Sequence, residues 1–257
     1  MILYFLILLF ILYVGLTYYR REGLENETDY KNFRNENIYN NFYTRIYDEL
    51  IHTIPYETEV IKLMVPLLGS NPNILCVGSR TGHIVQLLTE TAQVTGLDNS
   101  KAMVRMSKYK YPKNKYVYGD YTDKNIFQEN TYTHIICPLF TIYRVKIDKF
   151  LDVMYRWTVH KGYVGIVYFK NGFNISQIKN QAPSESFKLN YTYTIEYSDN
   201  IIKEKITNTN DKTRINKLEL NDISDLEQSA INTGFKKVKN YEIRNMPYTY
   251  MLLLQKV

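Results

Sequence analysis

The stretch "NILCVGSRTGHIV", residues 73–85, contains an apolar run that stops at Gly78 and a helix-like pattern that resumes after Gly82. The run predicts a buried strand, and the later spacing predicts a helix. A strand that ends in a glycine turn and leads into a helix offers free backbone N–H groups and a positive helix end to an anion. Glycines also occur in ordinary strand–helix turns, so the stretch alone does not specify a ligand.

Strands and helices alternate around this stretch from residue 38 onward. The expected strands span residues 73–78, 93–98, 115–119, 131–137 and 162–169, and the expected helices span 38–51, 56–69, 82–91, 100–110, a short polar one near 122–128, and 146–159. Short connections between alternating strands and helices predict right-handed βαβ units. The fold class is therefore α/β, with a Rossmann-like, doubly wound parallel sheet.

The pattern changes in the C-terminal third. Residues 187–209 alternate with period two across a Ser-Asp-Asn turn, which predicts an inserted antiparallel hairpin. Residues 223–234 predict a helix that ends at Gly234. The stretches 235–245 and 248–257 then predict a final hairpin.

The composition is that of a globular chain with a mild basic excess. The net charge is +6 and the pI is about 9.0, without a long run of Lys or Arg, which is a weak basis for nucleic-acid binding. The two cysteines, Cys76 and Cys137, make a disulfide framework unexpected, and a reducing compartment fits better. The four histidines lack metal-ligand spacing, so we expect no metal site.

The N-terminus predicts a membrane anchor. Residues 1–19, "MILYFLILLFILYVGLTYY", carry no charge and precede Arg20 and Arg21. As a helix they would span about 28 Å, close to the hydrocarbon thickness of a bilayer. Neither a basic start nor a small-x-small site is present, which favours a retained single-pass anchor over a cleaved signal peptide. The positive-inside rule places the rest in the cytosol. Residues 20–37 are a polar tether, and residues 38–257 are the folded domain.

Two carboxylates end consecutive strands beside the glycine turn. Asp98 follows Gly78 by twenty residues and can accept both hydroxyls of a ribose. It could instead cap the next helix, although Asn99 and Ser100 could do this equally well. Asp120 ends the third strand and could accept from an exocyclic amine such as that of adenine, or serve as a cap. Together they imply a ligand with a ribose, an adenine and a further group at the turn.

Four segments in order resemble the signature segments of class I S-adenosylmethionine-dependent methyltransferases. They are "NILCVGSRTGH", "VTGLDNSKAMV", "VYGDYTD" and "THIICPLFTIYRV". The small-molecule branch (methyltransferase type 11/25-like) is most similar, because Gly96, Asp98, Ser100 and Met103 match its second segment. Residues 234–257 resemble the family's last helix-to-strand hairpin. The resemblance covers roughly residues 38–257 and implies a seven-stranded sheet whose last strand is antiparallel.

The resemblance also implies where S-adenosylmethionine binds. Its methionine part would lie at the Gly78–Gly82 turn, its ribose at Asp98 and its adenine at Asp120 with Tyr121 beside it. The tyrosine-rich helix 38–51 could cover the cofactor, with Tyr47 in contact, or its aromatic residues could simply pack on the sheet. The expected cofactor-binding residues are Gly78, Ser79, Arg80, Gly82, Asp98, Asn99, Asp120, Tyr121 and Tyr47.

Two positions depart from the family pattern. Cys76 stands where an acidic residue usually helps to hold the ammonium group of the cofactor. Arg80 stands at the usual middle glycine of the turn. Its side chain could crowd the cofactor, pair with the methionine carboxylate, or point into solvent.

No catalytic constellation is expected, because the sulfonium is already a strong electrophile and the protein mainly aligns donor and acceptor. Phe140, Tyr143 and Arg144 follow the fourth strand and are candidates to line the acceptor site, with ordinary packing as the alternative. The run 137–140 is only faintly similar to the Asn-Pro-Pro-aromatic motif of nucleobase amino-methyltransferases. Nucleic acid is therefore an unlikely acceptor.

The favoured function is a membrane-anchored S-adenosylmethionine-dependent methyltransferase whose acceptor is a small molecule, a lipid or a membrane protein. A catalytically inactive module with this fold, tethered to a membrane, is the alternative that Cys76 and Arg80 suggest. A nicotinamide-dependent oxidoreductase is disfavoured, since position 80 is not glycine and Asp120 would have no role.

Overall fold

A computed structural model describes residues 10, 30–51, 56–138, 141–169, 191–198, 200–244, 246 and 248–257. The expected anchor, apart from residue 10, and the candidate Phe140 lie outside these residues. Within the described part of the chain, no helix has both the length and the apolar character needed to cross a bilayer.

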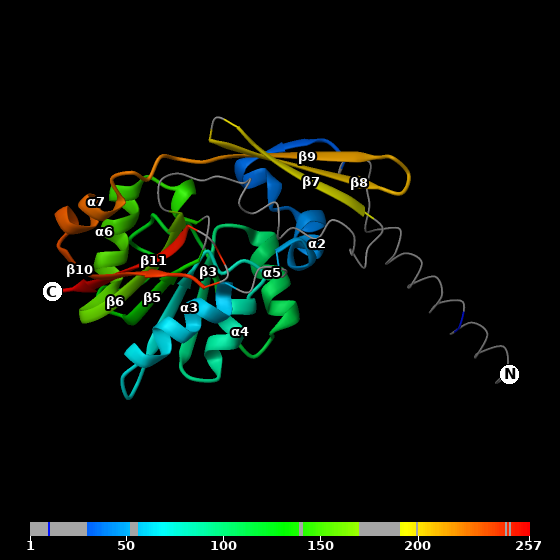
Figure 1. Cartoon of the computed structure of the whole chain (residues 1–257). Coiled ribbons are helices and arrows are strands. Elements are labelled where there is room, and N and C mark those ends of the chain that lie inside the picture. Colours follow the sequence, from blue (N-terminus) through cyan, green and yellow to red (C-terminus); the bar gives the residue numbers. More distant parts are fainter. Residues whose placement is uncertain are drawn as a thin grey trace, which may run out of the picture.

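A seven-stranded sheet forms the centre of the fold (Figure 1), in the strand order β10-β11-β6-β5-β2-β3-β4. Strands β2 to β6 run parallel to one another, whereas β11 pairs antiparallel with both β6 and β10. The prediction of a doubly wound sheet with an antiparallel last strand is thereby confirmed. Its strands are β2 (Asn73–Val77), β3 (Gln93–Asp98), β4 (Lys115–Tyr118), β5 (Tyr132–Cys137), β6 (Thr158–Phe169), β10 (Phe235–Glu242) and β11 (Thr249–Lys256).

Helices cover this sheet in two groups: α3 packs on α4, and α6 packs on α7. Apolar residues of the central strands are fully buried between these groups, as Ile74–Val77 of β2 illustrate. The left-handed Gly234 ends α7, as the sequence predicts. The helical segments are α2 (Asn41–Ile51), α3 (Tyr56–Met64), η3 (Val65–Leu67), α4 (His83–Thr89), α5 (Lys101–Lys110), η4 (Ile142–Arg144), α6 (Ile147–Trp157) and α7 (Leu226–Thr233).

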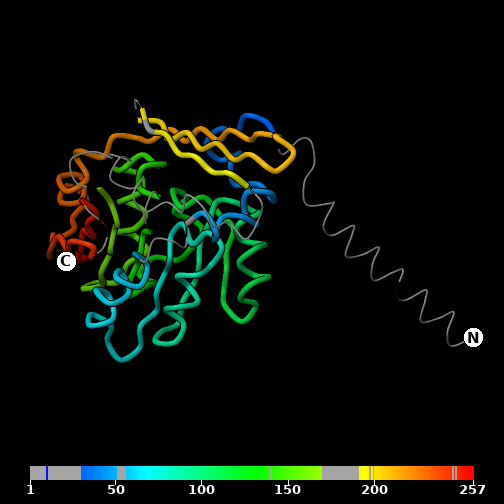
Figure 2. Tube along the Cα trace, turned by 45° about the vertical axis from the view of Figure 1, so that its right-hand side comes forward, coloured from blue at the N-terminus to red at the C-terminus, as the bar shows by residue number. Residues whose placement is uncertain are grey.

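A second, four-stranded sheet lies across one end of the molecule (Figure 2), with the order β1-β9-β8-β7. Its strands are β1 (Asn32–Arg34), β7 (Tyr191–Ser198), β8 (Ile201–Asn208) and β9 (Thr213–Glu219). The antiparallel pair β7–β8 confirms the predicted hairpin. The insertion is larger than predicted, however, because β9 pairs with β8 as a third strand.

Strand β1 corrects the predicted tether. Residues 32–34 pair in parallel with residues 215–217 of β9, and the short helix η2 (Asn35–Ile38) follows at once. Residues 32–37 therefore belong to the folded part of the chain. A strand of three residues is too short to show period-two alternation, and its partner lies about 180 residues further along.

The short helix expected near residues 122–128 is also wrong. This segment contains turns in which the side chains of Asp120 and Asp123 accept the backbone N–H groups of Thr122 and Asn125. Such local bonds compete with helical hydrogen bonds, and they explain why a polar stretch with helix-like spacing remains irregular.

Candidate functional site

The turn between β2 and α4 is held in a conformation that requires glycine at two positions. Gly78 and Gly82 have φ angles of +76° and +89°. A Cβ atom on Gly78 would lie 2.2 Å from the Thr141 hydroxyl oxygen, and one on Gly82 would lie 2.5 Å from the Tyr116 hydroxyl. Neither position has room for a side chain, so both positions require glycine.

Arg80 lies inside this turn and also has a left-handed φ, +53°. Its side chain folds back onto the protein: Nη1 donates to the Tyr56 hydroxyl at 2.9 Å, and the guanidinium carbon lies 5.7 Å from the centre of the Tyr47 ring. The sequence left open whether this arginine points into solvent, and the structure shows that it does not. Tyr47 of α2 is brought to the turn through this contact.

Asp98 ends β3 directly beside the turn and is only 5% exposed. Its carboxylate accepts the N–H of Arg80 at 2.8 Å and that of Ser100 at 2.9 Å. Burial raises the pKa of this carboxyl group. Ser100, rather than Asp98, caps α5 by accepting the N–H of Met103. A carboxylate can accept about four hydrogen bonds, so Asp98 keeps acceptor capacity for a ligand.

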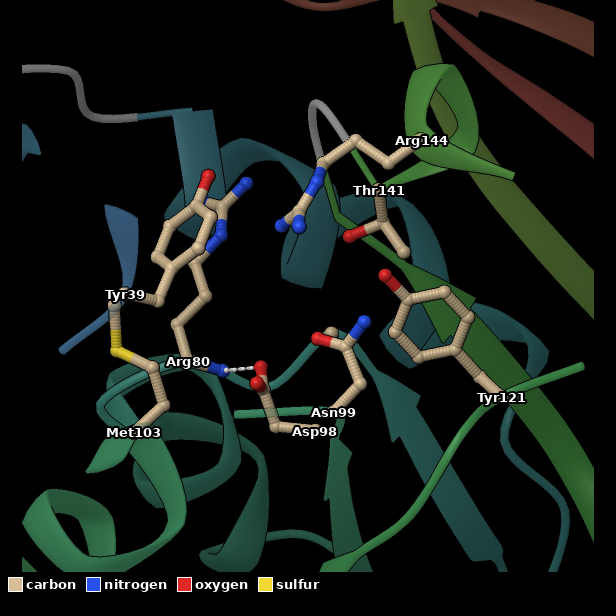
Figure 3. A pocket seen from close by; sticks show the side chains of 9 residues that line it. Tyr39, Arg80, Asp98, Asn99, Met103, Tyr121, Thr141 and Arg144 are labelled. Atoms are coloured by element: carbon tan, nitrogen blue, oxygen red, sulfur yellow. Dashed lines mark hydrogen bonds between the residues drawn. The ribbon is translucent and has the colours of Figure 1, made fainter. Parts of the chain in front are cut away.

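A cleft that is partly open to solvent lies where β2 and β3 end. Figure 3 shows Arg80 and Tyr39 on one side of it, Tyr121 on the other, and Arg144 opposite Asp98. Its lining residues are Tyr39, Gly78, Arg80, Asp98, Asn99, Met103, Tyr121, Thr141 and Arg144. Six of these (Gly78, Arg80, Asp98, Asn99, Tyr121 and Arg144) are among the residues that the sequence analysis selected.

Other selected residues lie near the cleft without lining it. Ser79 is buried against Gly96, and Gly82 packs against Tyr116, so both shape the turn. The Tyr143 hydroxyl accepts the N–H of Phe169 at 2.8 Å, which fixes the end of β6. These three positions fit the packing alternative better than direct ligand contact.

Asp120 differs from Asp98 in its exposure, in its hydrogen-bond partners and in its position relative to the cleft. It is exposed, and its Oδ1 accepts both the N–H and the hydroxyl of Thr122, at 2.8 and 2.9 Å. It is not among the residues that line the cleft. An adenine contact at Asp120 therefore stays a prediction from the family resemblance.

Three lining residues escaped the sequence analysis as site residues. Tyr39 lies in the irregular link between η2 and α2, where no periodicity marks it. Met103 was matched only as part of the second signature segment. Thr141 directly follows Phe140 in the expected acceptor loop, and this position in the chain could have identified it.

Cys76 and Cys137 are fully buried on the adjacent strands β2 and β5. Burial raises the pKa of Cys137 to about 12 and that of Cys76 well above its usual value, and the carboxylate of Glu57 raises the pKa of Cys76 further. Both thiols are therefore neutral, and Cys76 cannot supply the negative charge of the family's acidic residue. In the described part of the chain, no three His, Cys, Asp or Glu side chains gather as metal ligands.

Comparison with known proteins relates this architecture to one family. Residues 75–166, from β2 into β6, match the family model described as a methyltransferase domain. No curated protein matches the sequence.

Several solved structures that resemble this chain are methyltransferases. An S-adenosylmethionine-dependent methyltransferase from Clostridium acetobutylicum has 14% identity and a TM-score of 0.62, with 83% of this chain and 97% of that chain covered. The CcbJ methyltransferase from Streptomyces caelestis has 15% identity and a TM-score of 0.62, with 87% and 99% covered. CalS10, an amino pentose methyltransferase from Micromonospora echinaspora solved with bound cofactor, has 10% identity and a TM-score of 0.61, with 80% and 92% covered. At these identities the likeness establishes the fold.

Proposed function

We propose that the chain is an S-adenosylmethionine-dependent methyltransferase, because residues 75–166 match the methyltransferase-domain model and the fold is that of structures with this activity in their names. The observation that carries the proposal is that Gly78 and Asp98 line the same cleft. The main chain at Gly78 forms part of the cleft wall, and the buried carboxylate of Asp98 keeps acceptor capacity for two hydroxyl groups.

The described residues fit this cofactor. Asp98 would accept the ribose hydroxyls, and the turn at Gly78 would receive the methionine part. Arg80 would donate to the methionine carboxylate, for which the guanidinium fork is well suited. Tyr121 and Asn99 would lie beside the base. The cofactor supplies an electrophilic methyl group, and these residues orient it.

Two tyrosines support the site beside these residues. Tyr39 lies over one side, and Tyr47 packs against the Arg80 guanidinium behind it. The role of the chain is then alignment of the acceptor with the methyl group, which needs no dedicated base for acceptors that are already nucleophilic.

The neutral thiol of Cys76 is the observation that favours the alternative, an inactive module of the same fold. An active methyltransferase releases a methylated product, whereas an inactive module does not. Incubation of the full-length chain with methyl-labelled S-adenosylmethionine, membranes and a small-molecule extract, followed by mass spectrometry, tests for a labelled product. We expect a product with the wild type and none with Asp98→Ala. Cofactor binding without any product from these fractions would favour the inactive module.

We further propose that residues 1–19 anchor the enzyme to a membrane with the domain on the cytosolic side. The support is the uncharged run followed by Arg20 and Arg21. Cell fractionation of the full-length chain beside a variant that lacks residues 1–23 tests this proposal. We expect the full-length chain to resist alkaline extraction from membranes and the shortened chain to be released. Release of both chains would contradict the anchor.

A further inference from the structure

Arg144 is a buried cation whose hydrogen-bonding capacity is largely unused. Its side chain is 10% exposed, and its Nε is buried without a hydrogen-bond partner among the described residues. Its one ion pair is long, 3.4 Å from Nη2 to Oε1 of Glu36, and the Glu36 side chain is 68% exposed. A buried guanidinium with so weak a partner is unfavourable unless a further group binds it.

The guanidinium of Arg144 points into the cleft (Figure 3). It lies against the Tyr39 ring, with 4.5 Å between the guanidinium carbon and the ring centre, and the hydroxyl-bearing side chain of Thr141 lines the cleft beside it. Asp98 lies opposite Arg144 across the cleft, and its carboxylate already accepts two backbone N–H groups. The guanidinium of Arg144 therefore faces the cleft with N–H groups that no described residue accepts.

The cofactor does not account for Arg144. In the proposed function the methionine carboxylate is held at the turn by Arg80, and the ribose by Asp98. Arg144 is contributed by η4, after β5, where the sequence places the approach of the acceptor. A planar guanidinium with free donors matches a planar carboxylate in a two-point contact.

We propose that Arg144 binds a carboxylate on the methyl acceptor, so that the substrates are small molecules that carry a carboxylate. The aromatic ring of Tyr39, which lies against the Arg144 guanidinium, makes the adjacent wall suitable for a flat apolar body. This inference rests on the proposed function, because it assigns the space that the cofactor leaves in the same cleft.

The test uses the full-length chain saturated with S-adenosylhomocysteine, so that the cofactor site and Arg80 are already occupied. Benzoate, benzamide and phenyl phosphate are then titrated and followed by ligand-observed NMR. Benzoate and benzamide have nearly the same shape but differ in charge. We expect benzoate to bind about 10- to 100-fold more tightly than benzamide, as charge-assisted hydrogen bonds in a buried site allow.

Two variants assign the effect to Arg144, and a third serves as the control. Arg144→Gln should remove the preference for benzoate, and Arg144→Lys should keep part of it. Arg156→Gln, which removes an arginine of α6 that pairs with Glu129 outside the cleft, should leave it unchanged. Retained affinity for S-adenosylhomocysteine shows that each variant is folded.

Equal binding of benzoate and benzamide, no binding of either, or an unchanged preference in Arg144→Gln would overturn the inference while leaving the cofactor site intact. Tighter binding of phenyl phosphate than of benzoate would overturn the assignment to a carboxylate. If the wild-type chain binds no S-adenosylhomocysteine, the proposed function fails and this inference fails with it.

Discussion

The small sheet and the cleft at the edge of the large sheet both bury charged side chains, but only the small sheet satisfies them fully. In the small sheet, Arg214 donates to Asn216 Oδ1 and to the Ile38 carbonyl, both at 2.8 Å, and its guanidinium carbon lies 3.8 Å from the centre of the Phe33 ring. In the cleft, Asp98 and Arg144 keep capacity that no described residue uses.

Glu204 in the small sheet follows the same rule as Arg214. Its carboxylate accepts from Tyr43 at 2.9 Å, from Tyr193 at 2.8 Å and from Asn216 at 2.9 Å. A fully satisfied buried network stabilises a fold, whereas a partly satisfied one costs free energy unless a ligand completes it. The difference distinguishes the charges of the small sheet from those that line the cleft.

The largest change in the free energy of unfolding is expected for a substitution of Arg214, which is fully buried. Arg214→Met leaves Asn216 Oδ1 and the Ile38 carbonyl without their donor, so the free energy of unfolding should fall by about 3 kcal/mol. Urea unfolding of the full-length chain measures this. The exposed Arg105, which bonds only to Asn41 among the described residues, gives the control Arg105→Met, expected within about 0.5 kcal/mol of wild type. Equal effects of the two changes would contradict the stabilising role of the buried Arg214 network.

The next effect concerns pH and the carboxylate of Asp98. Burial raises its pKa, so the folded apo-protein holds this proton more tightly than the unfolded chain does, and the group's contribution to stability falls as pH rises through that range. Ribose hydroxyls need the ionised form as acceptor. Affinity for S-adenosylhomocysteine should therefore fall as the solution is acidified, up to about tenfold per pH unit, beginning above the usual aspartate range.

Calorimetric titrations over a pH series measure this dependence, with Asp98→Asn as the matched control. The variant should bind more weakly at neutral pH and show a flat profile. A wild-type profile as flat as that of the variant would show that Asp98 does not hold the ribose.

A smaller effect is expected from the left-handed backbone at Arg80. Arg80→Gly and Arg80→Ala both remove the bond to Tyr56 and the charge beside the cofactor, but only glycine relaxes the φ of +53°. The glycine variant should be more stable than the alanine variant by about 1 kcal/mol in urea unfolding. Both should bind the cofactor more weakly than wild type. Tighter binding by Arg80→Gly would show that Arg80 crowds the site.

The smallest effect is expected at Asp120, whose exposed carboxylate already bonds to Thr122. Asp120→Asn should change the affinity for S-adenosylhomocysteine by about threefold or less, because an exposed hydrogen bond contributes little. A loss as large as that of Asp98→Asn would restore Asp120 as a principal adenine contact and would break the distinction between buried and exposed carboxylates.

Local signals explain which parts of the structure the sequence could predict. Apolar runs and the glycines at positions 78, 82 and 234 identify strands, helices and turns, and the βαβ rules then predict which strands are neighbours. Asp98 lies in the cleft, as its place at the end of β3 predicts. The strand β1 and the Arg214 network could not be predicted, since they depend on contacts across about 180 residues that leave no periodicity in the chain. Tyr39 enters the cleft for the same reason, because it follows η2, whose Ile38 is held by Arg214.

Isothermal titration of the full-length wild type and of Asp98→Ala with S-adenosylhomocysteine would decide whether this cleft binds the cofactor. We expect saturable binding at micromolar concentrations by the wild type, and a loss of about 100-fold or more in a folded Asp98→Ala, since a buried acceptor of two hydroxyl groups is removed. Absence of binding by the folded wild type, or equal binding by the two proteins, would contradict the assignment of this cleft to the cofactor.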